Sequence, residues 1–196
     1  LFRSDFSDAP DTYGTTIASG IGAKHIIFPP VNLGALIDGE TDGIPDVTAQ
    51  GDDNDKLDDE DGIEFLTPLL LDQNAEIEAE VFGDAFLNAW IDLDANGIFE
   101  MDEQIIDDAP LSTGTHNFQF FIPDDSFIGK TYMRFRYGPE GLFPVDSNNI
   151  PASYGEVEDY QVEIFGYEYG DAPEGVAAYP SLGITGSFPT CASCGP

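Results

Sequence analysis

Positive charge is scarce in this chain. Six Lys and Arg residues stand against 38 Asp and Glu residues, which gives 196 residues a formal net charge of −32. Such a chain repels nucleic acid and anionic membrane surfaces, so we expect neither as a partner. Disordered chains normally combine high charge with few aromatic residues. Here 12% of the residues are aromatic and 41% are hydrophobic, which favours a folded domain.

Long apolar runs and recognisable catalytic motifs are also missing. Without a long apolar segment we expect no direct membrane insertion and no retained signal peptide. The sequence contains no nucleophile elbow, no phosphate loop and no His-rich metal signature. His25 and His116 are isolated, and we expect neither to be catalytic or to bind zinc. Paired carboxylates, as glycosidases use, arise in so acidic a chain from composition alone. We therefore expect no enzyme.

Cysteine is limited to Cys191 and Cys194, which lie together in the segment "CASCGP". A C-x-x-C pair can be redox-active, half of a zinc site, a haem attachment or a local disulfide. No His follows for haem, and no second ligand pair lies nearby for zinc. We favour a small structural disulfide formed in an oxidising compartment, with an interchain bond as the alternative.

The segment "WIDLDANGIFEMDEQ", residues 90–104, carries the clearest functional signal. Its spacing matches positions 1, 3, 5, 6, 7 and 12 of a calcium-binding loop, with Gly97 at the position of the sharp turn. The predicted oxygen ligands are Asp92, Asp94, Asn96, the backbone carbonyl of Ile98, and Glu103. Asp102 or Glu100 would act directly or through water. The alternative is a hairpin turn rich in Asp, Asn and Gly that simply favours water.

The residues around this loop do not resemble the helices of an EF-hand. The preceding "AFLNAWIDL" alternates apolar and polar residues and is rich in strand formers. We therefore expect calcium to hold two β-strands together and not to operate a helical sensor. Because millimolar calcium is found outside cells, this prediction also favours an extracellular location.

A second acidic run, "GDDNDKLDDEDG", occupies residues 51–62. A solvated linker is the ordinary explanation of such a charge run. Its carboxylates nevertheless alternate with small or polar residues in a way that would wrap a second cation. The candidate ligands are Asp52, Asp53, Asp55, Asp58, Asp59 and Asp61.

From residue 63 onward, alternating apolar and polar residues predict one strand after another, with almost no helical pattern. The runs "AEIEAEVFG", "GTHNFQFFIP" and "KTYMRFRYG" are examples. Strands at this spacing favour an all-β fold, an immunoglobulin-like antiparallel β-sandwich with long acidic loops. Arg134 and Arg136 occupy alternate positions, so they share one face of a strand. We expect them to pair with neighbouring carboxylates.

The run "YGEVEDYQVEI", residues 154–164, resembles the signature of the GEVED domain, a module of large secreted and surface-bound bacterial proteins. The runs "DFSDAPDTYGT", "GDDNDKLDDEDGIEF", "AWIDLDANGIFEMDEQ" and "MRFRYG" resemble the same family, in the expected order. The resemblance implies an extracellular β-sandwich with calcium-type acidic loops and no established catalytic activity. It also implies structural roles for Glu156, Glu158 and Asp159, which would meet Arg134, Arg136 or a cation.

The resemblance divides the chain into three parts: a loop-rich N-terminal segment (1–50), a GEVED-like sandwich (51–166) and a C-terminal segment (167–196). The third part repeats the Asp-Ala-Pro of the opening, as if a next module began there. Residues 1–10 carry apolar side chains at Phe2 and Phe6 and end at a Pro, so they could add as a strand to a neighbouring copy.

We therefore expect a non-enzymatic structural protein of the bacterial cell surface, stabilised by calcium. It would be a subunit or repeat of a pilus-like fibre or of an adhesin, and its partners would be copies of itself or neighbouring modules. The alternative is a carbohydrate-binding or accessory domain of a secreted hydrolase, with glycans as ligands.

Overall fold

A computed structural model describes residues 3–28, 30–37, 39–51, 59–146, 153–167 and 177–185. Every regular element in these residues is a β-strand or a short 3-10 turn, so the predicted all-β class is confirmed. Within the same residues, no helix is long and apolar enough to cross a membrane. Several residues singled out in the sequence lie outside the described ranges: Phe2, Asp52, Asp53, Asp55, Asp58, Cys191 and Cys194.

The chain divides into two compact units, residues 1–165 and residues 166–196. The first unit combines the N-terminal segment with the GEVED-like region. The second unit corresponds to the predicted C-terminal segment. Its described part contains β13 (Ala177–Tyr179), the 3-10 turn η5 (Pro180–Leu182) and β14 (Ile184–Thr185), with β13 antiparallel to β14.

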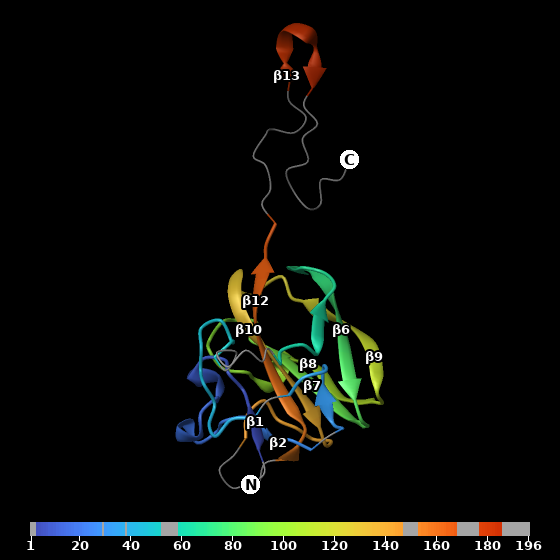
Figure 1. The fold of residues 1–196 in the computed structure, drawn as a ribbon. Helices are drawn as coiled ribbons and strands as arrows, with labels where there is room; N and C mark the ends of the chain where they lie inside the picture. The colour runs from blue at the N-terminus through green and yellow to red at the C-terminus, as the bar shows by residue number, and fades with distance from the viewer. Residues whose placement is uncertain are drawn as a thin grey trace. The chain divides into compact units, whose positions relative to one another are not determined.

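Two sheets make up most of the first unit (Figure 1). The larger sheet contains, in order, β5 (Leu69–Leu70), β12 (Glu156–Phe165), β10 (Gly129–Gly138), β7 (Ala85–Ile91) and β8 (Gln104–Leu111). The second sheet contains β3 (Asn32–Leu33), β4 (Ile63–Phe65), β6 (Gln73–Phe82) and β9 (Gly114–Ile122). In this second sheet β6 is central, because β3, β4 and β9 all pair with it.

The two sheets share one hydrophobic core, which follows from the alternation in the sequence. Side chains along a strand point to opposite faces in turn, so every second residue of β6 faces inward. The inward residues are completely buried: Ala75, Ile77, Ala79 and Val81. The Glu residues between them lie on the other face. The facing strands contribute further buried side chains to the same cluster, among them Leu87, Phe135 and Ile164.

The larger sheet is also covered on its second face. Trp90 of β7 is fully buried there, in a separate cluster with Ala9, Tyr13 and Phe99. As a result, β10 is buried on both faces between β12 and β7. The N-terminal segment is therefore part of the folded unit and brings Tyr13 against the strand that enters the acidic loop.

A small third sheet anchors the N-terminal segment. It contains β1 (Ser4–Phe6), β2 (Lys24–Ile26) and β11 (Ser153–Tyr154), and the 3-10 turns η1 (Asp11–Tyr13) and η2 (Ile17–Ser19) lie between β1 and β2. β1 pairs with β2 of the same chain in antiparallel direction, and Phe6 is 5% exposed. The predicted assembly residue Phe6 thus lies in its own chain's fold.

The prediction of an antiparallel sandwich was wrong for two strand pairs. β11 pairs with β2 in parallel, and β12 pairs with β5 in parallel. A tight hairpin forces two strands to run antiparallel, but these partners are far apart in the sequence and no turn fixes their direction. Alternation of apolar residues identifies a strand without stating which way its neighbour runs.

Candidate metal site

The acidic loop connects β7 to β8, as the alternating pattern before it predicts. β7 ends at Ile91, and the 3-10 turn η4 (Met101–Glu103) leads into β8. Gly97, at the sixth position of the loop, has φ +89°. Side chains with a Cβ rarely adopt that conformation, so glycine suits the sharp turn there. The turn lets the two ends of the loop approach each other.

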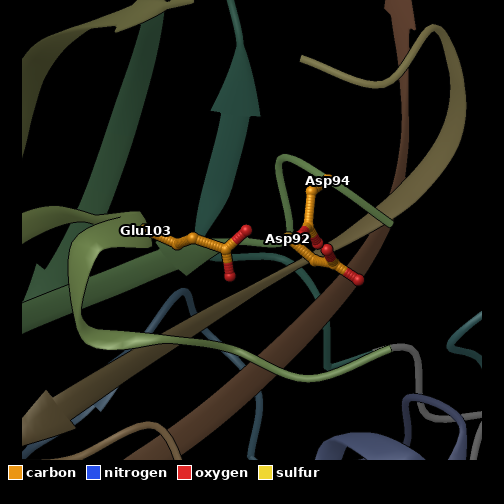
Figure 2. A group of neighbouring side chains, drawn as sticks. All are labelled: Asp92, Asp94 and Glu103. Carbon is orange, nitrogen blue, oxygen red and sulfur yellow. The ribbon is translucent and has the colours of Figure 1, made fainter. Parts of the chain in front are cut away.

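Three predicted ligands come together at the base of the loop. Asp92, Asp94 and Glu103 each offer a carboxylate oxygen, and these oxygens lie within 4.8 Å of one another. Figure 2 shows Asp94 and Glu103 pointing towards Asp92 from different parts of the loop. Asp92 and Glu103 are buried and Asp94 is exposed, so the group opens to solvent on one side only. This partly buried acidic group could hold a metal ion.

Hydrogen bonds fix Asp92 from two directions. Its carboxylate accepts from the Gly97 amide at 2.9 Å and from the Asn96 amide at 3.2 Å, which curls the loop around it. It also accepts from the Tyr13 hydroxyl at 2.6 Å. Burial and the adjacent Asp92 raise the pKa of Tyr13 well above its usual range, so Tyr13 stays a neutral donor. The loop is thereby tied to the N-terminal segment.

Glu103 closes the loop from its far end. Its carboxylate accepts from the Leu93 amide at 2.6 Å and from the Glu100 amide at 3.0 Å. Burial raises the pKa of Glu103 to about 7, and the charges of Asp92 and Glu100 contribute to the rise. A divalent cation would offset this repulsion, since it favours the charged form of each carboxylate.

The remaining predicted ligands lie on the exposed side of the loop. The Asn96 side chain donates to Asp94 at 3.2 Å and to Glu100 at 2.9 Å. The Ile98 amide donates to the Asn96 side chain at 3.0 Å, and the Ile98 side chain is exposed. The structure thus places Asn96 beside the acidic group, held by hydrogen bonds within the loop.

Asp125 was not among the residues predicted from the sequence. A cavity of about 260 Å³ adjoins the acidic group, and Asp125 lines it together with Asp94, Glu100, Asp102 and Glu103. Asp125 lies in the connection between β9 and β10, and only the fold brings it to the loop. An acidic residue in a connecting turn carries no sequence signal that would distinguish it from many others in this chain.

The donor set fits a hard cation such as calcium, which prefers six to eight oxygen ligands. Carboxylates supply the three converging oxygens, and neighbouring acids line the open side. Among the described residues, the ion pairs join Arg134 to Asp159 and Arg136 to Asp146, so no Lys or Arg pairs with this group there. A bound cation would balance the negative charge of these carboxylates.

The two arginines of "RFRYG" are buried and form a second polar layer with their hydrogen-bond partners. Arg134 forms a bidentate ion pair with Asp159, with Nε to Oδ1 at 2.7 Å and Nη2 to Oδ2 at 2.8 Å. Neither side chain is exposed. Arg134 also donates to the carbonyls of Tyr13 at 2.7 Å and Pro144 at 2.9 Å. One guanidinium therefore joins β10, β12, the N-terminal segment and the 139–146 loop.

Arg136 forms the other half of this layer. It pairs with Asp146 at 2.9 Å and donates to Nε2 of His25 at 2.9 Å. Burial and the charge of Arg136 hold the pKa of His25 well below its usual range, so His25 is neutral. Its Nδ1 then carries the hydrogen, which can be donated to the Tyr154 carbonyl at 3.2 Å. His25 has a structural role here.

Glu156 and Glu158 bind backbone amides and form no ion pair with the arginines. Glu156 accepts from the Leu33 amide at 2.5 Å, and Glu158 accepts from the Gly62 amide at 3.0 Å. Glu158 also accepts from the Tyr160 hydroxyl at 2.9 Å. Burial raises the pKa of Glu158 to about 8, and the charges of Asp61 and Asp59 add to the rise.

We expect Glu158 to make stability depend on pH. Its pKa is about 8 in the folded chain and about 4.3 in an unfolded one. The folded state therefore binds the proton more tightly, and this contribution is lost as pH rises from about 4.3 to about 8. Glu158→Gln mimics the protonated form, so its unfolding free energy should exceed that of wild type increasingly over this interval. Urea unfolding at several pH values measures the difference; a constant difference would contradict a raised pKa.

Comparison with known families gives one match. The family model described as the GEVED domain matches residues 86–163, which run from β7 into β12. The matched region includes the acidic loop, both buried arginines and all three acids of the "GEVED" run. Comparisons with curated proteins and with solved structures gave no significant match.

Proposed function

We propose that this chain is a calcium-stabilised structural module of the bacterial cell surface, because residues 86–163 match the GEVED domain model. GEVED domains are typical of secreted and surface proteins, which agrees with an extracellular location. In this proposal calcium ties the β7–β8 loop to its supporting strands and has no catalytic task. The immunoglobulin-like relationship of the fold remains part of this proposal.

One observation carries the proposal: Asp92, Asp94 and Glu103 converge within 4.8 Å on a loop that has the spacing of a calcium site. The spacing is a property of the sequence, and the convergence is a property of the fold. Tyr13 bonds directly to Asp92, so an ion at this point would stabilise the contact between the loop and the N-terminal segment. Thermal unfolding with calcium and with chelator tests the proposal.

Within this proposal, the module serves as a subunit of a fibre or as a repeat of an adhesin. Strand addition between copies would require residues 1–10 to leave their present partners, since β1 pairs with β2 of its own chain. The Asp5 carboxylate also accepts from the Val157 amide at 2.6 Å, in a buried position. Exchange of this segment between copies would preserve the same contacts, as domain swapping does.

A reversible lock on β1 tests strand addition. Ser4 lies opposite Ile26, so Ser4→Cys with Ile26→Cys, in a chain with Cys191→Ser and Cys194→Ser, would form a disulfide within one copy. If copies exchange β1, the oxidised chain stays monomeric and the reduced chain forms fibres, as seen by electron microscopy. Equal fibre formation by both forms would contradict strand addition, and the reduced form is the matched control.

The alternative, a carbohydrate-binding or accessory domain, has less support. Sugar binding commonly uses exposed aromatic rings, and the single tryptophan of the chain, Trp90, is fully buried. A glycan array and a panel of hydrolase substrates, both with calcium present, distinguish this alternative from a structural module. Specific glycan binding would favour it.

A further inference from the structure

An apolar groove lies on the first unit, between the acidic loop and the loop that follows β10. Its volume is about 820 Å³. One wall is formed by residues 139–146 and the other by Phe99, Glu100 and Met101, with Ile21, Arg136 and Ser153 completing the lining. It adjoins the cavity beside the candidate metal site, because Glu100 lines both. Neither the calcium loop nor the family match explains this groove.

Large apolar side chains of the groove are exposed to water. Met101 is 59% exposed, Phe143 is 56% exposed and Ile21 is 40% exposed. Single exposed apolar residues are ordinary, but several that line one hollow are typical of interaction surfaces. The groove thus offers apolar surface that a bound side chain could cover.

Contacts from two buried arginines hold the walls of the groove in place. Arg136 donates to the Phe143 carbonyl at 2.7 Å, and Arg134 donates to the Pro144 carbonyl at 2.9 Å. On the other wall, the Arg134 guanidinium lies 5.2 Å from the centre of the Phe99 ring. Both arginines are buried, so the donor side of these hydrogen bonds is shielded from solvent. A preformed groove loses little conformational freedom when a ligand binds.

The rim of the groove is acidic. Glu100, Glu140 and Asp146 line it, and the one positive side chain of the lining, Arg136, is 1% exposed and paired with Asp146. The whole chain adds to this field, with a formal charge of −32. An apolar hollow with a negative rim is complementary to an apolar ligand that carries positive charge, and repels an acidic one.

We propose that this groove binds an extended peptide segment of another protein, in which an aliphatic or aromatic side chain is flanked by Lys or Arg. The apolar side chain would pack between Met101 and Phe143. The flanking basic groups would lie near Glu100 and Glu140. A second copy of this chain matches the groove poorly by charge, because it carries the same −32. This inference does not depend on metal binding at the neighbouring loop.

The test measures binding of four fluorescein-labelled synthetic peptides to the full chain by fluorescence anisotropy. The first peptide is Gly-Lys-Leu-Phe-Lys-Gly, the second replaces both Lys by Glu, and the third replaces Leu-Phe by Ser-Ser. We expect the first to bind at least about tenfold more tightly than either of the others. A fourth peptide with the sequence of residues 186–196, "GSFPTCASCGP", represents an uncharged segment of a second copy.

Matched variants locate the binding. Phe143→Ser should weaken binding of the first peptide about tenfold, because an anchoring aromatic contact is lost. Phe121→Ser is the control, since Phe121 is similarly exposed at 52% on β9 and does not line the groove. Circular dichroism of both variants confirms that they fold. Glu140→Gln should weaken binding by a smaller factor through the loss of one rim charge.

Four results would overturn the proposal. The first is that no peptide binds, and the second is that the basic polar peptide binds as tightly as the basic apolar one, which would show charge attraction alone. The third is equal loss of affinity in Phe143→Ser and Phe121→Ser. The fourth is tighter binding of the peptide from residues 186–196, which would identify a second copy as the occupant.

Discussion

Asp159→Ala is expected to lower the unfolding free energy by about 3–5 kcal/mol, the largest effect of any single change considered for this chain. The reason is that Arg134 would be left buried and charged without its partner, since neither side chain is exposed. The Ala9 amide would also lose its acceptor, which is the Asp159 carboxylate at 2.9 Å. Domains of ordinary stability have unfolding free energies of about 5–15 kcal/mol, so the variant should be close to unfolding.

Urea unfolding of wild type and variant measures this effect. Glu163→Ala is the matched control, because Glu163 lies on the same strand, β12, with an exposed side chain. A surface change of this kind should alter the unfolding free energy by no more than about 0.5 kcal/mol. If Asp159→Ala lowered the unfolding free energy as little as Glu163→Ala does, the buried Arg134–Asp159 pair would not be the link between the N-terminal segment and the sheet.

Calcium is expected to raise the melting temperature by roughly 5–10 °C. An ion that binds only the folded state at about a hundred times its dissociation constant adds about 2.7 kcal/mol. For a chain of this size, each kcal/mol corresponds to about 2–4 °C. Asp94→Ala should remove most of this response while leaving the chain stable with chelator, because Asp94 is exposed and its hydrogen bonds are to Asn96.

The control for that experiment is Asp102→Ala. The sequence offered Asp102 as an additional ligand, but Asp102 is exposed, lines the cavity beside the group and is not one of the three converging carboxylates. Its melting temperature should still rise with calcium. Identical melting curves with calcium and chelator for the wild-type chain would contradict the proposed stabilisation. Equal loss of the response in both variants would show that calcium binding depends on the acidic charge of the loop in general and not on the three converging carboxylates.

The features that depend on local sequence were predictable. The alternation of β6 identifies a strand and its buried face, because side chains on a strand alternate strictly. The spacing from Asp92 to Glu103 identifies the loop, because a calcium ligand set imposes a fixed order of oxygen donors and one sharp turn. In both cases the signal is contained within about a dozen consecutive residues.

The features that depend on contacts between residues distant in the sequence were not predictable from it. Tyr13 bonds to Asp92, and Asp125 lines the cavity beside the loop, although neither lies near the loop in the sequence. The partners of Arg134 and Arg136 illustrate the same limit. In a chain with 38 acidic residues, residue type alone cannot select Asp159 and Asp146. The strand register makes the first selection, since Arg134 lies directly opposite Asp159.

Isothermal titration calorimetry with calcium tests the central claim most directly, because it measures calcium binding itself and not the resulting change in stability. We expect the wild-type chain to bind calcium at a site that Asp94→Ala and Glu103→Gln abolish and that Asp102→Ala retains. Glu103→Gln keeps the shape of the side chain, removes its charge and retains one of the two hydrogen bonds that the Glu103 carboxylate accepts from the loop amides. Absence of calcium binding by the wild-type chain, or unchanged binding in both loop variants, would contradict a calcium site formed by Asp92, Asp94 and Glu103.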